Sequence, residues 1–153
     1  MTKIESSVIA RDFKRARTYL TLLEQAEADW DAKPNKTKGQ KKVQSLIHEA
    51  FSLAAVVAYI RPFTNAIRTS SKPVTKPWID RDKIRPLLKS ELLEFHDEMD
   101  ALRHRTWAHT AEENFKPNEI LSIARGRIYV FRNLIDEVER LLVVKDHDKP
   151  AAE

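Results

Sequence analysis

The stretch LLKSELLEFHDEMDALRHRTWAHT, residues 87–110, combines a helical core pattern with a terminal cluster of basic and aromatic side chains. Apolar residues recur there at steps of three and four, the spacing that places side chains on one face of an α-helix. This face consists of Leu88, Leu92, Phe95, Met99 and Leu102. The pattern predicts a helix over residues 87–107 that packs into a core and holds Arg103 at the border of that core.

Similar apolar stripes predict three further long helices, over residues 4–31, 41–66 and 117–144. The second of these has the widest apolar face, so we expect it to be the most buried element. The chain contains two glycines, which leaves few positions for the tight turns of an all-β fold. The sequence therefore predicts an all-α protein, arranged as an antiparallel four-helix up-and-down bundle.

Local signals predict where these helices begin, bend and touch. Thr2 and Glu5 have the spacing of a capping box at the start of the first helix. Pro62 should kink or end the second helix, because proline lacks a backbone N–H and clashes with the preceding turn. Pro117 suits the first turn of the fourth helix. Gly126, inside that helix, should mark a close contact between helices.

Two polar connections separate the helices. Residues 33–42 contain five lysines with a proline and a glycine, which predicts a loop. Residues 70–89 contain three prolines and should form an irregular connection with at most a short helical turn. Residues 61–89 contain eight lysines and arginines but only two acidic residues, Asp80 and Asp82. The first helix also carries a basic side, which we interpret as a solvated face: Arg11, Lys14, Arg15 and Arg17.

Length and composition place the chain among ordinary globular proteins. Charged residues make up 33% of the chain and hydrophobic residues 42%. We expect one domain over residues 1–146, followed by a disordered tail over residues 147–153. The chain has no cysteine, its first residues lack a signal-peptide pattern, and its longest apolar run, 51–60, is too short for a membrane span. These features predict a cytoplasmic protein, and the net charge of +4 permits contact with nucleic acid.

The end of the third helix resembles the Arg-polar-x(4)-His motif of HEPN domains, which are small helical bundles that include many RNA-cleaving toxins. Arg103, His104 and His109 occupy the arginine, polar and histidine positions of that motif. Within this family the most similar pattern reads Leu-Arg-Asn-Lys-x-x-Ala-His. Leu102 and Ala108 match it, Arg105 keeps the charge of the lysine, and His104 stands where asparagine is usual.

The resemblance implies a metal-independent endoribonuclease of toxin or phage-defence type, without a cofactor, that acts on RNA as a homodimer and has an antitoxin as partner. It implies a catalytic role for Arg103, His104 and His109. It places Arg105, Trp107 and Asp100 beside the RNA. Cleavage through the 2′-hydroxyl needs proton transfer, which suits histidine, and stabilisation of charge on phosphate, which suits arginine.

The spacing of Arg103 and His109 bears on how such a site could be built. Six residues on a straight helix separate two side chains by about 120° around the axis. The two groups would converge on one phosphate only if the helix loosens before His109 or if a second copy completes the cleft. Trp107 could then stack on a base or pack at the dimer seam, and it could equally fill the core beside Met99.

Two other interpretations remain open at this point. His96, Asp100 and His104 lie at four-residue steps, a spacing that can present metal ligands along one helix face. Asp100 could instead pair with Arg103 or with His104. A HEPN-like bundle without catalysis, serving as a nucleotide- or protein-binding module, is the alternative to a ribonuclease, and the histidine at position 104 favours it.

Overall fold

The computed structural model of the chain describes residues 3–64, 77–109 and 123–147. In helix ends at 3–5, 104–109 and 144–147 this description covers the backbone only. All regular structure within these ranges is helical, which confirms the all-α class. The α-helices are α1 (Lys3–Asp31), α2 (Lys38–Ile60), α3 (Arg81–Ile84), α4 (Ser90–His109) and α5 (Ile128–His147). Short 3₁₀ helices occupy η1 (Arg61–Phe63), η2 (Arg85–Leu87) and η3 (Arg125–Arg127).

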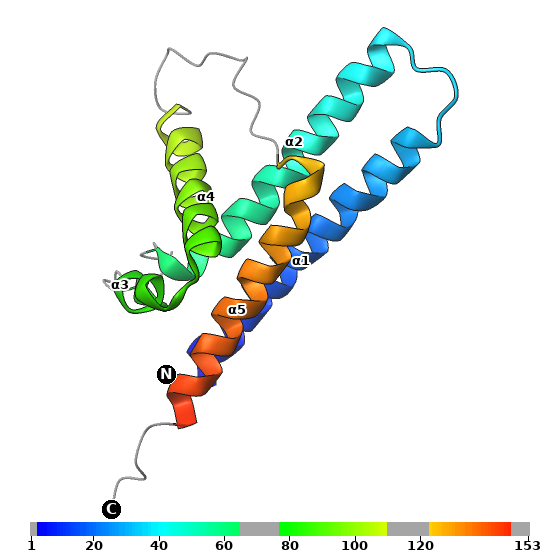
Figure 1. The fold of residues 1–153 in the computed structure, drawn as a ribbon. Coiled ribbons are helices and arrows are strands. Elements are labelled where there is room, and N and C mark those ends of the chain that lie inside the picture. The colour runs from blue at the N-terminus through cyan, green and yellow to red at the C-terminus, as the bar shows by residue number, and fades with distance from the viewer. Residues whose placement is uncertain (1–2, 65–76, 110–122, 148–153) are drawn as a thin grey trace, which may run out of the picture.

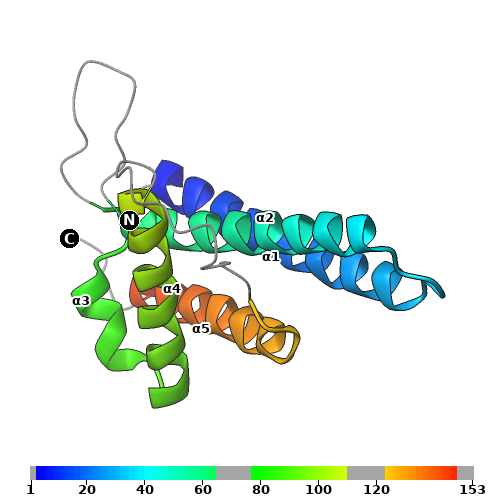
Figure 2. The same cartoon turned by 90° about the horizontal axis from the view of Figure 1, so that it is seen from above.

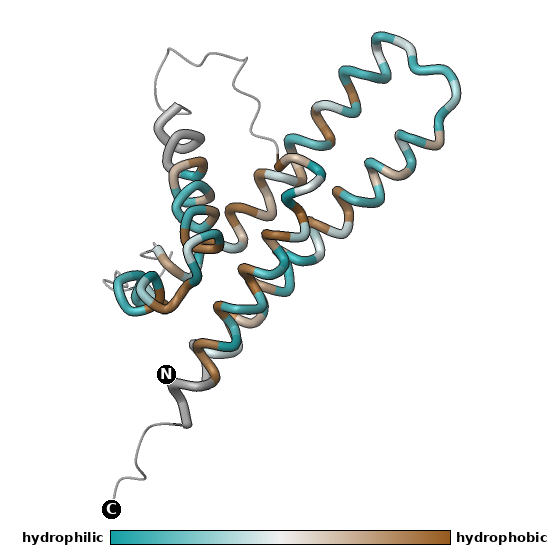
Figure 3. The backbone as a smooth tube through the Cα atoms, in the orientation of Figure 1, coloured by the Kyte–Doolittle hydropathy of each residue, from teal (hydrophilic) through white to brown (hydrophobic). Residues whose placement is uncertain are grey.

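Helices α1 and α2 form a long antiparallel hairpin, and α5 lies along this hairpin beside α1 (Figure 1). Helix α4 packs against α2 and α5 but is inclined to them, with α3 at its amino-terminal end (Figures 1 and 2). Polar residues dominate the tip of the hairpin, whereas apolar residues are frequent where α2, α4 and α5 approach one another (Figure 3).

The centre of the core is a group of aromatic side chains around Tyr59 of α2. Its ring stacks on Phe13 of α1 at 5.8 Å between centroids and meets Phe131 of α5 edge-on at 5.3 Å. Phe131 in turn meets Phe95 of α4 at 5.4 Å. One aromatic cluster thus joins all four long helices, and such edge-to-face pairs add about 0.5–1.5 kcal/mol each beyond the area that they bury.

Ion pairs at the surface hold α5 against α1. Arg17 donates hydrogen bonds to Asp136 at 2.5 Å and to Glu139 at 2.6 Å, and Arg132 donates to Glu24 at 2.6 Å. The sequence predicted that Arg17 lies on a solvated basic face. This prediction is wrong for Arg17, because its side chain belongs to the contact between α1 and α5. Exposed pairs of this kind contribute at most about 1 kcal/mol each, so the core dominates stability and the ion pairs fix alignment.

The turn between α1 and α2 ends in a capping box that sequence analysis did not identify. Thr37 Oγ1 accepts the backbone N–H of Gln40 at 3.3 Å, and Gln40 Oε1 accepts the backbone N–H of Thr37 at 3.0 Å. This cap starts α2 at Lys38 and shortens the predicted 33–42 loop, because it satisfies two backbone N–H groups at the helix end. The capping box predicted at Thr2 lies outside the described residues.

The carboxyl-terminal end of α2 follows the prediction made from Pro62. The helix ends at Ile60, and Pro62 lies in η1, which finishes before the extended residue Thr64. The predicted continuation to residue 66 is therefore wrong at Thr64. The backbone N–H of Ile79 donates to the carbonyl of Pro62 at 2.9 Å, so the chain returns to this end of α2 before it enters α3.

Helix α2 turns several of its polar side chains inward. Gln44 donates to the carbonyl of Ala26 at 2.9 Å, and the buried Ser52 Oγ accepts the backbone N–H of Ile123 at 3.1 Å. Its outer side near the hairpin tip carries exposed aliphatic residues, Val43 and Leu46 among them. By length and composition alone the segment Lys38–Phe63 could cross a membrane, but the carboxyl-terminal turns of α2 are packed in the core of this fold.

The prediction for the last helix is wrong at its beginning. Ile123 and Ala124 are not helical, η3 covers the next three residues, and α5 begins only at Ile128. Residues 117–122, where the helix was expected to start, lie outside the described residues. Gly126 has no atom within 4 Å of the place where a Cβ would stand, so it marks no close helix contact.

Candidate functional site

Helix α4 carries the predicted motif and runs without a break from Ser90 to His109. It begins three residues later and ends two residues later than predicted. Arg103 is half-buried and is the last residue of α4 whose side chain the structure describes. The backbone of His104, Arg105, Trp107 and His109 belongs to the same helix, while the side chains of these four residues lie outside the description.

The continuity of α4 fixes how the backbone positions of Arg103 and His109 lie relative to each other. The two positions are six residues apart, about 9 Å along the axis and about 120° around it. Since α4 does not loosen before His109, one copy of the helix does not present both positions on one face. The two positions thus lie on different faces of one continuous helix.

Asp100, three residues before Arg103, is engaged by an arginine that sequence analysis did not pair with it. Arg81 of α3 donates Nη1 to Oδ2 at 2.7 Å and Nη2 to Oδ1 at 2.8 Å. Both side chains are largely buried, and this two-pronged geometry is the strong form of an arginine–carboxylate contact. A contact between Asp100 and RNA would require this pair to open.

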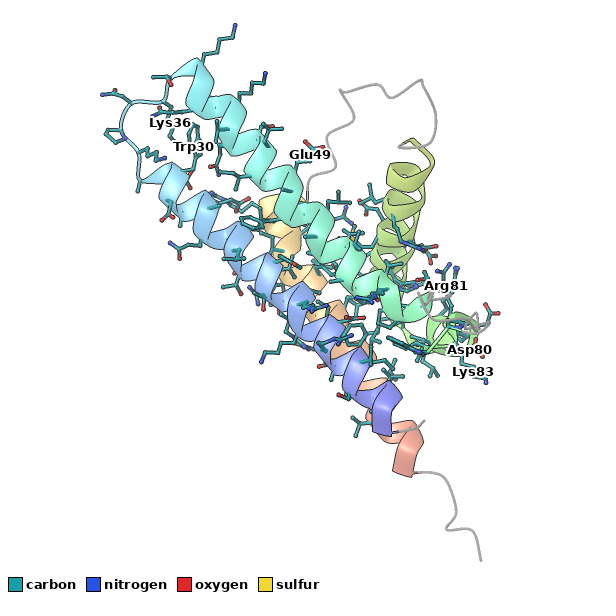
Figure 4. All side chains as sticks on the ribbon, turned by 180° about the vertical axis from the view of Figure 1, so that it is seen from behind. Trp30, Lys36, Glu49, Asp80, Arg81 and Lys83 are labelled. Atoms are coloured by element: carbon teal, nitrogen blue, oxygen red, sulfur yellow. The ribbon has the colours of Figure 1, made fainter. Side chains whose placement is uncertain are left out.

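The basic connection before α4 is partly neutralised by α4 itself. Besides Arg81, Arg85 donates to Asp97 at 2.8 Å. On the other side of α4, Arg127 donates to Glu98 at 2.7 Å and lies over the ring of Phe95 at 4.6 Å. These contacts hold α3, η2 and η3 around α4, and Figure 4 shows Arg81 beside α3 with Asp80 and Lys83. Part of the positive charge before α4 is therefore neutralised by ion pairs that hold the fold together.

His96 lies inside the core, where its ring is fully buried. Its Nδ1 shares a hydrogen bond of 2.8 Å with the hydroxyl of Tyr59, and the ring of Phe63 stands 5.0 Å away. Burial, together with the positive charge of Arg81, lowers the pKa of His96 from 6.5 to about 4. The imidazole is thus neutral at neutral pH, and the Tyr59 phenol, whose pKa is raised by burial, keeps its proton.

These contacts argue against the metal-binding interpretation of α4. His96 Nδ1 is taken by Tyr59, and its other ring nitrogen, Nε2, is buried without a hydrogen-bond partner. Asp100 is held by Arg81, and the side chain of His104 lies outside the description. Two of the three proposed ligands thus already have structural partners in the described part of the chain, and His96 faces the core rather than the surface.

Two buried carboxylates were missed from the sequence, Glu27, which pairs with His48 and Arg125, and the more deeply buried Asp12. Asp12 sits among the apolar residues of α1 and is 1% exposed, with arginines from two segments around it. A single acidic residue at the edge of an apolar stripe gives a weak signal, because the same pattern arises when the side chain reaches solvent. The arginine from the second segment, Arg61, could not be assigned to it without the fold.

Comparisons of the chain with protein-family models, with curated proteins and with solved structures found no match.

Proposed function

We propose that this protein is a metal-independent endoribonuclease that works as a homodimer in the cytoplasm, with an HEPN-like up-and-down helical bundle. The observation that carries the proposal is the continuity of α4 from Ser90 to His109. It keeps the positions of Arg103 and His109 on one continuous helix but on different faces, so that two copies of the helix can supply complementary groups to one cleft.

In the proposed reaction the 2′-hydroxyl of the RNA attacks the adjacent phosphorus. A histidine at position 109 takes part in the proton transfers, because its ordinary pKa lies near neutral pH. The guanidinium of Arg103 stabilises the negative charge that grows on the phosphate oxygens. His104 completes the motif, and Arg105 and Trp107 hold the RNA by charge and by stacking. The products are a 2′,3′-cyclic phosphate and a 5′-hydroxyl.

His96 has no part in this chemistry. It is the one histidine of α4 whose side chain the structure describes, and its lowered pKa and burial suit a neutral core residue. The proton transfers are therefore assigned to the carboxyl-terminal turns of α4, beyond the Arg81–Asp100 pair that anchors the helix on α3.

A mixing experiment tests the composite site. Arg103→Ala and His109→Ala proteins are purified separately, shown to be inactive on single-stranded RNA, then mixed and allowed to exchange subunits. After random exchange about half of the dimers are mixed, and the shared cleft of each mixed dimer keeps one intact arginine and one intact histidine, so part of the wild-type activity should return. A mixture that stays inactive although subunits exchange would exclude a cleft shared in this way.

The same experiment distinguishes the alternative, a non-catalytic bundle that binds nucleotides or another protein. In that case the wild-type protein leaves RNA intact at every concentration, and so does each variant. An antitoxin-like partner is compatible with both functions, so capture of a partner does not separate them.

A further inference from the structure

Arg103 of the α4 motif apart, the described arginine side chains fall into two groups by their contacts. Seven of them each donate hydrogen bonds of 2.5–2.8 Å to one or two carboxylates: Arg17, Arg81, Arg85, Arg125, Arg127, Arg132 and Arg140. Three others, Arg11, Arg15 and Arg61, have only Asp12 nearby, at 3.8, 3.8 and 3.6 Å. These distances are too long for hydrogen bonds.

The three guanidinium groups therefore share one carboxylate and keep their donors available. Asp12 is 1% exposed, and within the described part of the chain neither of its oxygens has a hydrogen-bond partner. The arginine side chains above it are about half exposed, at 51% for Arg11, 53% for Arg15 and 48% for Arg61. Three positive charges against one negative charge leave this cluster with a net charge of +2.

The geometry favours an anion that bridges the outer sides of these arginines. The buried carboxylate attracts the three guanidinium groups, while about half of each arginine side chain remains exposed to solvent. Guanidinium donors match pairs of phosphate oxygens, and three of them paired with a single carboxylate attract polyanions. Arg11 and Arg15 stand on neighbouring turns of α1, so they suit successive groups of an extended ligand better than one enclosed ion.

The cluster lies near the carboxyl-terminal end of α2, where the middle of α4 packs against that helix. Arg61 follows Tyr59 by two residues, and the Tyr59 hydroxyl is hydrogen-bonded to His96 of α4. Arg103 lies seven residues beyond His96, about 10 Å further along α4. The carboxyl-terminal turns of α4 lead away from the α3 end of the molecule (Figure 1), so the cluster is a surface distinct from the motif.

We propose that Arg11, Arg15 and Arg61 bind the phosphodiester backbone of single-stranded RNA, with Asp12 gathering the three side chains. This inference rests on the proposed function, because it takes RNA as the ligand. It adds a binding surface on α1 and η1 that is separate from the motif on α4 and that does not read sequence.

The test measures binding without cleavage. The probe is a fluorescent single-stranded 2′-O-methyl RNA, which lacks the attacking hydroxyl, and its affinity for the whole chain is measured over a series of salt concentrations. The variant Arg11→Gln/Arg15→Gln/Arg61→Gln should bind about tenfold or more weakly at low salt. Its plot of log affinity against log salt should be shallower by about 2, since each phosphate contact on a single strand adds about 0.7 to the slope.

A charge-matched control separates this site from the general field of the protein. Arg127→Gln/Arg132→Gln/Arg140→Gln removes three arginines that already have carboxylate partners, and it should leave the slope within about 0.5 of the wild-type value. An equal loss in both triple variants would overturn the proposal. If the triple cluster variant does not fold, Arg11→Gln and Arg15→Gln alone should each lower the slope by about 0.7, and an unchanged slope in both would overturn it equally.

The outcomes also distinguish this proposal from the proposed function. If the protein binds the probe through the arginine cluster but never cleaves RNA, the proposed ribonuclease activity is contradicted and the proposed binding surface is supported. If the protein cleaves RNA but the slope of log affinity against log salt is the same in wild type and in the cluster variant, only the proposed binding surface is contradicted. Cluster-dependent binding to phosphatidylserine vesicles, with RNA affinity unaffected, would assign the arginines to a membrane and contradict the inference.

Discussion

Arg81 and Asp100 are joined by two parallel hydrogen bonds, 2.7 Å from Nη1 to Oδ2 and 2.8 Å from Nη2 to Oδ1. The pair connects α3, a helix of four residues, to the half of α4 that carries the motif. Because α3 has little apolar surface of its own to bury, this contact is a principal link between the two elements, with the buried Ile84 beside it.

We predict that Arg81→Ala lowers the free energy of unfolding by about 1–3 kcal/mol, since it leaves the largely buried Asp100 carboxylate without this partner. Arg81→Lys should recover only part of the loss, because an ammonium group cannot make both bonds at once. Urea unfolding followed by circular dichroism measures the difference. The matched control is Lys83→Ala, whose side chain is 72% exposed and which should change stability by less than about 0.5 kcal/mol.

His96 should make the protein less stable in acid. Its pKa is about 4 in the folded protein and 6.5 for the ordinary side chain, so the unfolded chain takes up the proton first as the pH falls. Stability should be independent of this group above pH 6.5 and should decrease between pH 6.5 and 4, by up to about 3 kcal/mol.

Thermal unfolding of wild type and His96→Gln at a series of pH values checks this expectation. The substitution lowers stability at pH 7, because it disturbs the hydrogen bond to Tyr59, but the difference between the two proteins should shrink towards pH 4. A difference that stays constant over the whole range would show that His96 does not titrate in this way.

Gly126→Ala should stabilise the protein by about 0.4–1 kcal/mol. The glycine lies in η3 with ordinary backbone angles, and a Cβ there would meet no atom within 4 Å. Alanine restricts the unfolded chain without straining the folded one. Gly39→Ala in the first turn of α2 is the companion test, for the same reason. A clear loss of stability in Gly126→Ala would instead support the close helix contact at Gly126 that the sequence predicted.

His109→Ala should reduce RNA cleavage by on the order of 10²-fold or more, the usual contribution of a positioned acid–base group. Arg103→Ala should lose a similar factor through weaker stabilisation of the phosphate charge, and Arg103→Lys should recover part of it. The assay follows a labelled RNA and identifies 2′,3′-cyclic phosphate ends. His48→Ala, which affects the Glu27 contact between α1 and α2, serves as the control and should retain activity.

Cleavage should survive EDTA if arginine and histidine supply the charge and the proton transfers. The measurement compares initial rates before and after chelation and dialysis. Complete loss of activity, restored by added zinc or magnesium, would contradict the proposed mechanism and would return attention to His104 as a ligand with partners other than His96.

The sequence predicts the helices well wherever apolar spacing alone determines them. The first helix was expected over 4–31 and is observed at Lys3–Asp31, and the break at Pro62 follows from the chemistry of proline. The beginning of the last helix was misplaced because Pro117 is a purely local signal. In the folded protein the chain is instead fixed at Ile123, whose N–H bonds to Ser52 of α2, seventy-one residues earlier.

The candidate site is predictable as a motif but not as a set of contacts. Arg103 and its neighbours are identified by spacing along one helix. The partner of Asp100 is not, because Arg81 lies nineteen residues away on another helix and local rules consider only neighbouring turns. Asp12 escaped notice for the same reason, since its meeting with Arg61 depends on how α1 and η1 pack.

The place of α5 beside α1 has a consequence for synthesis on the ribosome. The α1–α2 hairpin is complete once Ile60 has emerged, but the ring of Phe131 that covers Tyr59 belongs to α5, which ends at His147. At usual elongation rates those 87 residues take roughly 4–17 s to follow. During that interval the nascent hairpin exposes the aromatic and aliphatic side chains that α5 later covers, and we expect chaperones that recognise exposed apolar surface to bind it there.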